Sequence, residues 1–169
     1  MNRIGMGFDQ HRLVAGRPLL IGGVEINYSR GLEGHSDADV LLHALMDALL
    51  GAAGQRDIGF HFPPDDCRYR GISSLELLVQ VRELLDRDCW QLVNADLVII
   101  AEEPKMAPYI EKINQKITSA LGVSKTSVSV KATTTEGLGS CGRGEGIAAA
   151  AVVLLEKKNH DRPAVNEAE

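Results

Sequence analysis

The pattern of apolar and polar positions divides this chain into alternating extended and helical segments. Period-two alternation and short apolar runs predict strands at residues 6–11, 92–100, 127–135 and 147–155. A further apolar run over 18–26 predicts a hairpin that turns at Gly22-Gly23. Spacings of three and four predict helices over 36–54, 73–88 and 108–122. Strands that alternate with helices favour a two-layer α/β (α+β) sandwich, in which a mixed sheet packs on helices.

The helix predicted over 36–54 is apolar or small on almost every side, which is typical of a buried helix. Ser36 and Asp39 have the spacing of a capping box at its start. Asp39, His43 and Asp47 recur every four residues and therefore share one stripe. A buried carboxylate is costly unless it is paired or bound to a metal. Capping alone explains Asp39, so we interpret His43 as a candidate metal ligand and Asp47 as a carboxylate that orients an imidazole.

Asp9 and His11 lie two residues apart in the first predicted strand. Both side chains therefore project from one face of that strand and offer a carboxylate and an imidazole to the same ion. Such a tripeptide alone is more often structural than metal-binding. With His43 as third ligand, it predicts a catalytic zinc-type site that keeps one coordination position open.

Composition limits the classes of protein that the chain can belong to. Its 169 residues, 44% hydrophobic and 24% charged, are typical of one globular domain. A net charge of −5 and the lack of a basic run argue against general nucleic-acid binding. Neither a signal peptide nor a membrane-spanning stretch is recognisable, and three irregularly spaced cysteines suggest reduced thiols in a cytoplasmic protein. Residues 1–156 are expected to form the domain, and the polar segment 157–169 to be disordered.

Two later segments have the chemistry of anion binding. Lys105 lies in a loop that follows an apolar strand, where ligands often bind in α/β folds. Residues 133–135 are three threonines followed by Glu136, and five glycines occur in 137–146, so hydroxyl and backbone N–H groups are available to phosphate oxygens. A carboxylate at Glu136 suits a hard cation such as Mg²⁺ between it and a phosphate. Arg143 fits either a phosphate fork or a structural ion pair.

Taken in order, the motifs form a set that one family shares. They are Gly7-Phe8-Asp9-x-His11, Gly34-His35-Ser36-Asp37-Ala38-Asp39-Val40-x-x-His43, Asp47-Ala48-x-x-Gly51-Ala52, Asp57-Ile58-Gly59-x-x-Phe62-Pro63, Pro104-Lys105, Lys131-Ala132-Thr133-Thr134-x-Glu136 and Gly142-Arg143-x-Glu145-Gly146. From Arg3 to about Leu155 the chain resembles the 2-C-methyl-D-erythritol 2,4-cyclodiphosphate synthase family of the non-mevalonate (MEP) isoprenoid pathway.

The resemblance implies a lyase that converts 4-diphosphocytidyl-2-C-methyl-D-erythritol 2-phosphate into the cyclic diphosphate and CMP. It implies a homotrimer with active sites between subunits, and no nucleic-acid or membrane partner. Zinc would be held by Asp9, His11 and His43, and a second ion, Mg²⁺ or Mn²⁺, by Glu136. His35 and Thr134 would stabilise the transition state.

The resemblance also implies the substrate contacts. Those near the zinc and the erythritol unit would be Asp9, Gln10, His11, His35, Ser36, Phe62, Pro63, Pro64, Asp65 and Asp66. The ribose would contact Asp57 and Gly59, and Ile58 between them would be a further substrate contact. The cytosine and diphosphate would contact Ala101, Glu102, Glu103, Pro104, Lys105, Met106, Ala107, Thr133, Thr134, Thr135 and Glu136, and Arg143 is a further candidate. Ser140 stands where many members have an aromatic residue, and the chain is too short for the cytidylyltransferase fusion of some members.

Two other functions fit the same residues. A metal-dependent phosphohydrolase would use the same three ligands to activate a water molecule. A non-catalytic trimeric module would bind a nucleotide or an isoprenoid without turnover.

Overall fold

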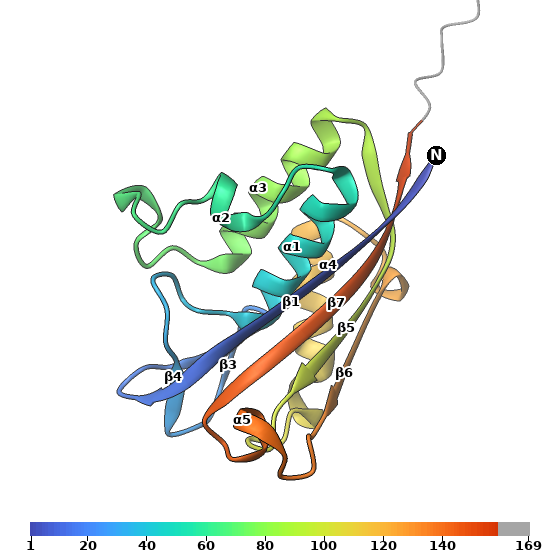
Figure 1. Cartoon of the computed structure of the whole chain (residues 1–169). Helices are drawn as coiled ribbons and strands as arrows, with labels where there is room; N and C mark the ends of the chain where they lie inside the picture. Colours follow the sequence, from blue (N-terminus) through green and yellow to red (C-terminus); the bar gives the residue numbers. More distant parts are fainter. Residues whose placement is uncertain (159–169) are drawn as a thin grey trace, which may run out of the picture.

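One mixed sheet of five strands forms one layer of the molecule, with the helices against it (Figure 1), in a computed structural model that describes residues 1–158. The strand order is β4-β1-β7-β5-β6. Its strands are β1 (Asn2–Ala15), β4 (Arg30–Leu32), β5 (Trp90–Ile100), β6 (Val128–Thr133) and β7 (Gly146–Lys157). β5 and β6 run parallel, and the other neighbours are antiparallel. The short strands β2 (Leu19–Ile21) and β3 (Val24–Ile26) form a separate hairpin whose turn residues, Gly22 and Gly23, both have positive φ.

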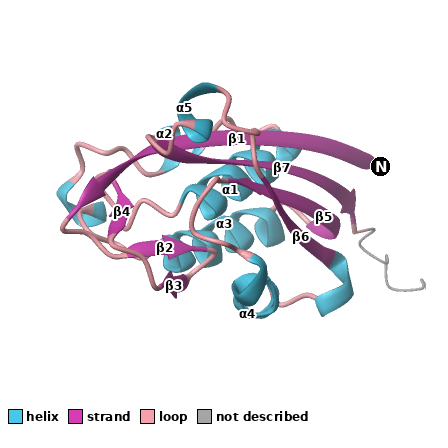
Figure 2. Ribbon diagram, turned by 90° about the horizontal axis from the view of Figure 1, so that it is seen from below, coloured by secondary structure: helices cyan, strands magenta, loops and turns pink. Residues whose placement is uncertain are grey.

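Three long helices, α1, α3 and α4, cover one side of the sheet (Figure 2). They span Val40–Ala53, Ser74–Arg87 and Ile110–Leu121. α1 lies against β1 and β7 and is buried along almost its whole surface, as its continuous apolar sequence predicts. Shorter helices are α2 (Ile58–His61), α5 (Gly139–Gly142) and the 3-10 turns η1 (Cys67–Tyr69), η2 (Ala107–Tyr109) and η3 (Lys125–Ser127).

The close contact of α1 with β1 depends on small residues in the strand. Gly5 and Gly7 face the helix, and a Cβ atom at Gly5 would come within 1.9 Å of the Ala48 carbonyl oxygen. Any larger side chain at Gly5 would therefore force the strand and the helix apart.

The other side of the sheet carries apolar side chains that none of the elements within residues 1–158 covers. Ile4 is 74% exposed and Met6 70% exposed, and Phe8 and Val152 are exposed beside them on the paired strands β1 and β7. A contiguous exposed apolar face of this kind marks an interaction surface.

The predicted architecture, one domain in which a mixed sheet packs on helices, is confirmed. The predicted start of the first long helix was wrong: Ala38 has a φ of 58°, outside the helical region, so α1 begins at Val40. Its N-cap is Asp39, whose side chain accepts from the Leu42 N–H. The segment 157–169 was expected to be disordered, which was wrong for Lys157, because this residue belongs to β7. Residues 159–169 of that segment lie outside the described residues. Among the described helices none combines the length and the apolar character that a membrane span requires.

Candidate metal centre and substrate cavities

Three potential metal ligands from β1 and α1 converge on one point. Asp9 Oδ2 lies 2.8 Å from His11 Nε2 and 3.0 Å from His43 Nδ1, and the two ring nitrogens are 3.2 Å apart. Asp9 and His11 point to the same side of β1, as their spacing predicts, and this is the side on which α1 lies. The predicted grouping of these three side chains is therefore present in the structure.

The three atoms fit a single divalent ion. Two ligand atoms of a tetrahedral ion with bonds of about 2.0–2.1 Å lie about 3.3 Å apart, close to the spacings found here. Burial by itself raises the pKa of Asp9, but the imidazoles of His11 and His43, which donate to the carboxylate when protonated, lower it below the ordinary value. Contact with the same carboxylate raises the pKa of His11. A carboxylate and two imidazoles are a typical donor set for a catalytic zinc site.

Asp47 does not have the predicted role. Its Oδ1 accepts a hydrogen bond from the backbone N–H of Ile58 at 2.8 Å, so it anchors the start of α2 instead of an imidazole. The polar groups within hydrogen-bond distance of His43 Nε2 are the hydroxyls of Ser74, at 3.1 Å, and Ser36, at 3.3 Å. His11 Nδ1 lies 2.7 Å from the carbonyl oxygen of Glu33.

The loop that carries His35 is held by its backbone. Arg17 donates to the carbonyl oxygens of Gly34 and Ser36, on either side of His35, at 2.8 and 2.9 Å. The carbonyl of His35 itself accepts from the N–H of Gly71. The imidazole of His35 is left exposed beside the candidate metal ligands, so the loop presents this side chain without confining it.

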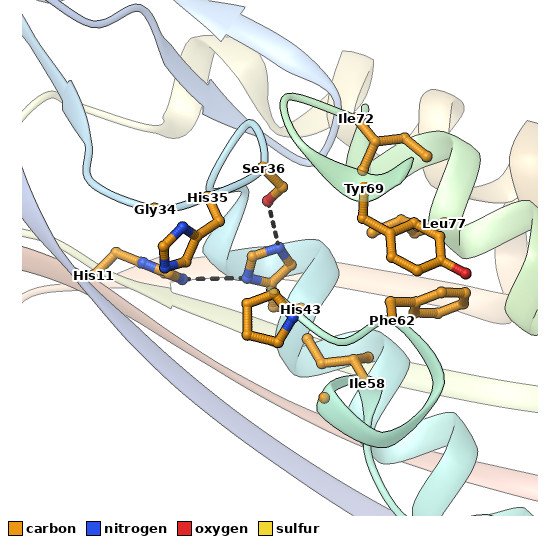
Figure 3. A pocket seen from close by; sticks show the side chains of 12 residues that line it. His11, Gly34, His35, Ser36, His43, Ile58, Phe62, Tyr69, Ile72 and Leu77 are labelled. Atoms are coloured by element: carbon orange, nitrogen blue, oxygen red, sulfur yellow. Dashed lines mark hydrogen bonds between the residues drawn. The ribbon is translucent and has the colours of Figure 1, made fainter. Parts of the chain in front are cut away.

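A cavity of about 240 Å³, here named the metal-side cavity, opens beside these ligands. Figure 3 shows the histidines and Ser36 along one side and aromatic and aliphatic side chains along the other. The rings of Phe62 and Tyr69 meet edge to face with centroids 5.4 Å apart. The full lining is His11, Gly34, His35, Ser36, His43, Ile58, Gly59, Phe62, Pro64, Tyr69, Ile72 and Leu77. A small ligand with a polar end and an apolar body suits this space.

Eight of the predicted contacts line a second cavity of about 290 Å³, here named the β6-end cavity. It is formed by Ala101, Glu102, Pro104, Lys105, Met106, Ala107, Ala132, Thr133 and Thr134. Through the strand pairs, Thr133 lies in the same row as Gln10, with β5 and β7 between them. Three strand spacings separate β1 from β6 by about 14 Å. The two cavities have no lining residue in common.

The glycine-rich segment is less available to anions than its composition predicts. The N–H of Gly137 donates to Glu102 Oε1, and those of Leu138, Gly142, Arg143, Gly144 and Glu145 donate to backbone carbonyls. Glu136, with a φ of 53°, is exposed and accepts from the Thr134 hydroxyl at 2.5 Å. For Arg143 the sequence left two roles open, a phosphate fork and a structural ion pair. In the structure Arg143 forms an ion pair with Glu145 at 2.7 Å.

Several predicted contacts lie away from both cavities. Gln10 points to the open face of the sheet and donates to Ser140 Oγ at 2.6 Å. Asp66 binds Arg68 through its carboxylate, which lowers the pKa of Asp66. Conversely, sequence reasoning missed Arg17, Ser74 and three apolar residues of the metal-side cavity, although it predicted Ile58, Phe62 and Pro64 there. Tyr69, Ile72 and Leu77 look like core residues in the sequence, and nothing there distinguishes them.

The fold and the site together define an α+β enzyme-like domain with a candidate metal centre beside a small cavity. The chain belongs to the YgbB family, whose model matches residues 2–156. It is 57% identical over 155 residues to a 2-C-methyl-D-erythritol 2,4-cyclodiphosphate synthase of Pelotomaculum thermopropionicum, covering 92% of this chain and 96% of that one. It is 60% identical over 157 residues to the enzyme of the same name from Geobacillus kaustophilus, covering 93% and 99%.

A solved structure is also similar over most of its length. The IspF–CDP complex of Plasmodium falciparum matches with a TM-score of 0.82 and 34% identity, covering 94% of this chain and 97% of that one. The likeness therefore extends from the sequence to the whole fold.

Proposed function

We propose that this chain is a 2-C-methyl-D-erythritol 2,4-cyclodiphosphate synthase. It would convert 4-diphosphocytidyl-2-C-methyl-D-erythritol 2-phosphate to the cyclic diphosphate and release CMP. The observation that carries the proposal is the convergence of Asp9, His11 and His43 at the metal-side cavity, in a chain 57–60% identical to enzymes of that name.

The reaction requires the substrate to fold on itself. An oxygen of the 2-phosphate attacks the β-phosphorus of the diphosphate, and the bond from that phosphorus to the bridging oxygen breaks. CMP leaves with the bridging oxygen and its electron pair. Because the attacking oxygen is already ionised, no general base is needed, and positioning and charge neutralisation account for most of the catalysis.

The residues of this chain divide these tasks between the two cavities. The apolar side of the metal-side cavity, with Phe62 and Ile58, suits the methylated carbon skeleton, and the exposed His35 can donate to a phosphate oxygen. In the β6-end cavity, Lys105 and the hydroxyls of Thr133 and Thr134 can hold the leaving CMP.

Zn²⁺ is the proposed ion for Asp9, His11 and His43, and Mg²⁺ or Mn²⁺ for Glu136. When bound, both would neutralise the diphosphate and polarise its P–O bonds.

A homotrimer with active sites between subunits is part of the proposal. A cavity of about 240 Å³ is small for a whole cytidine diphosphate ester, and the β6-end cavity of the same chain lies across the sheet. A neighbouring subunit that covers the exposed Met6 and Phe8 could bring its own β6-end cavity to this one. The CDP of the Plasmodium falciparum complex is in keeping with a cytidine nucleotide at such a site.

Product analysis tests the function. The purified protein, supplied with zinc, magnesium and the substrate, should give a ring diphosphate and one CMP per turnover. A linear product with inorganic phosphate would instead identify a phosphohydrolase.

A His43→Ala variant separates an enzyme from a binding module. We expect it to lose zinc and turnover while the fold is retained, because the ring lies at one end of α1 and the rest of that helix is unchanged. Wild-type turnover in this variant would refute the assignment of the site.

A further inference from the structure

The hydrogen bonds around His11 fix which of its ring nitrogens carries the proton. His11 Nδ1 is 2.7 Å from the carbonyl oxygen of Glu33, which can only accept, so Nδ1 carries the hydrogen of the neutral ring. The lone pair is then on Nε2, the atom that faces Asp9 Oδ2 at 2.8 Å.

The same reasoning applied to His43 leads to Ser74. The hydroxyl of Ser74 donates to Asp37 Oδ1, because a carboxylate has no hydrogen to give. Towards His43 the Ser74 oxygen must therefore accept, and it does so from His43 Nε2 at 3.1 Å. The lone pair of His43 is consequently on Nδ1, 3.0 Å from Asp9 Oδ2.

When both rings are neutral, these tautomers leave three acceptors facing one another with no hydrogen between them. Asp9 Oδ2, His11 Nε2 and His43 Nδ1 lie 2.8 to 3.2 Å apart, a repulsive contact that a cation relieves. The outer hydrogen bonds of both rings thus prepare the cluster for an ion.

We propose that Ser74 and Asp37 are positioning residues that hold His43 in its Nε2–H tautomer, with Nδ1 free for a divalent cation. The inference rests on the proposed metal site and assigns to this pair the task that the sequence predicted for Asp47.

Two features make the pair suited to this task. Ser74 is fully buried, so water does not compete for its hydroxyl. Asp37 Oδ2 also accepts from the backbone N–H of Ser74 at 2.8 Å, which fixes the serine at the first turn of α3 with both of its polar groups on one carboxylate.

Zinc affinity of the full-length protein tests the inference. We expect Ser74→Ala to weaken zinc binding about 10–100-fold in competition with a chromophoric chelator. Ser73→Ala is the matched control, because Ser73 caps the same helix through the Leu75 N–H and is not a partner of His43. The control should lose some helix stability and keep its zinc affinity within about twofold. Equal losses in both variants, or no loss in Ser74→Ala, would overturn the proposal.

A second measurement does not depend on zinc binding. Long-range ¹H–¹⁵N NMR of the zinc-free wild-type protein at mildly alkaline pH should show His43 protonated at Nε2. In Ser74→Ala, and to a smaller extent in Asp37→Asn, part of the population should move to the Nδ1–H form. An Nδ1–H ring in the wild type would contradict the inference. If the wild type bound no zinc but showed the Nε2–H ring, the metal in the proposed function would fail and the positioning by Ser74 would stand.

Discussion

Gly7 of β1 lies directly against Ala44 of α1: a Cβ atom at position 7 would come within 1.9 Å of the Ala44 carbonyl oxygen. His43 precedes Ala44, and Asp9 follows Gly7 by two residues. The missing side chain of one glycine therefore sets the distance at which the carboxylate on the strand meets the imidazole on the helix.

Replacing Gly7 with alanine should separate β1 from α1. We expect Gly7→Ala to lower the free energy of unfolding by about 1–3 kcal/mol or more, because the added methyl group clashes with the backbone of α1, which cannot move aside. Zinc affinity should fall with it, because His43 moves away from Asp9. Urea unfolding and chelator competition measure the two effects.

Gly51→Ala is the matched control on the same helix. Gly51 is exposed, and an added Cβ would meet nothing within 4 Å. Alanine there should raise the free energy of unfolding by about 0.5–1 kcal/mol. A Gly7→Ala protein as stable as the wild type would contradict the close contact.

Asp39 connects α1 to the β2–β3 hairpin through a buried carboxylate. It accepts from the N–H groups of Gly22, Gly23 and Leu42 at 2.7 to 3.1 Å, although its burial raises its pKa. Asp39→Ala would leave three donors without this acceptor, two of them on buried residues, and should cost about 3 kcal/mol or more of unfolding free energy. Asp86→Ala, at an exposed aspartate on α3, should change it by less than about 0.5 kcal/mol. Thermal or urea unfolding of both variants compares them.

The three candidate metal ligands could be predicted because their grouping depends on local geometry. Asp9 and His11 share a strand face by parity alone, and His43 is one of few polar residues on an apolar helix. The docking of α1 on β1 then brings the three side chains together. Gly5 and Gly7 permit this close contact, but they can be recognised as contact residues only when it is known that α1 packs against β1.

The supporting residues could not be predicted, because they depend on which distant segments meet. Ser74 reaches His43 from 31 residues further along the chain. Asp47 has the helical spacing that the prediction required, but its carboxylate accepts a hydrogen bond from the Ile58 N–H at the start of α2. The shift of the helix start from Ser36 to Val40 follows from the positive φ of Ala38, a conformation that alanine seldom adopts. The family resemblance implies that residues of both cavities contact one substrate. In one chain these residues lie apart, because the strand order sets the distance between the two cavities.

Glu102 connects the two loops of the β6-end cavity, and this contact should depend on pH. Its Oε1 accepts from the N–H groups of Gly137 and Thr135 at 3.1 and 2.9 Å, and the Gly137 bond contributes most to lowering the pKa of Glu102. In the folded state the pKa of Glu102 is lower than the value of about 4.3 for an unfolded chain. The contact therefore stabilises the loop fully at pH values above the unfolded pKa, and this stabilisation is lost as the pH falls through the folded-state pKa.

The amide chemical shift of Gly137 reports this titration. We expect a midpoint below that of an ordinary glutamate, and Glu102→Gln should abolish the transition. Glu103→Gln is the control, because Glu103 is exposed and does not contact these amides. A Gly137 midpoint at or above the ordinary value would show that the carboxylate does not hold the loop.

Arg17 should affect turnover through the loop that carries His35. Its guanidinium donates to the carbonyls of Gly34 and Ser36, and a lysine cannot reach both with the same fixed fork. We expect Arg17→Lys to lower kcat by about 10-fold, the cost of roughly 1.4 kcal/mol in positioning. Zinc affinity should change little. Arg87→Lys, at an exposed arginine on α3, is the control, and an unchanged kcat in Arg17→Lys would contradict the role.

Mixed oligomers test whether one active site uses two subunits. His43→Ala damages the metal-side cavity only, and Lys105→Ala damages the β6-end cavity only. In a ring, each site would join the metal side of one subunit to the β6 end of the next. When the two variants mix randomly in equal amounts, each half of a site is intact in about half of the cases, so about one quarter of the sites are complete. Co-expressed variants should therefore recover about one quarter of wild-type activity, although each alone is inactive. Co-expressed His43→Ala and Asp9→Ala share the damaged side and should recover none, because no pairing rebuilds a complete site. Sites contained within single chains would leave both mixtures inactive, since every chain then carries its own defect.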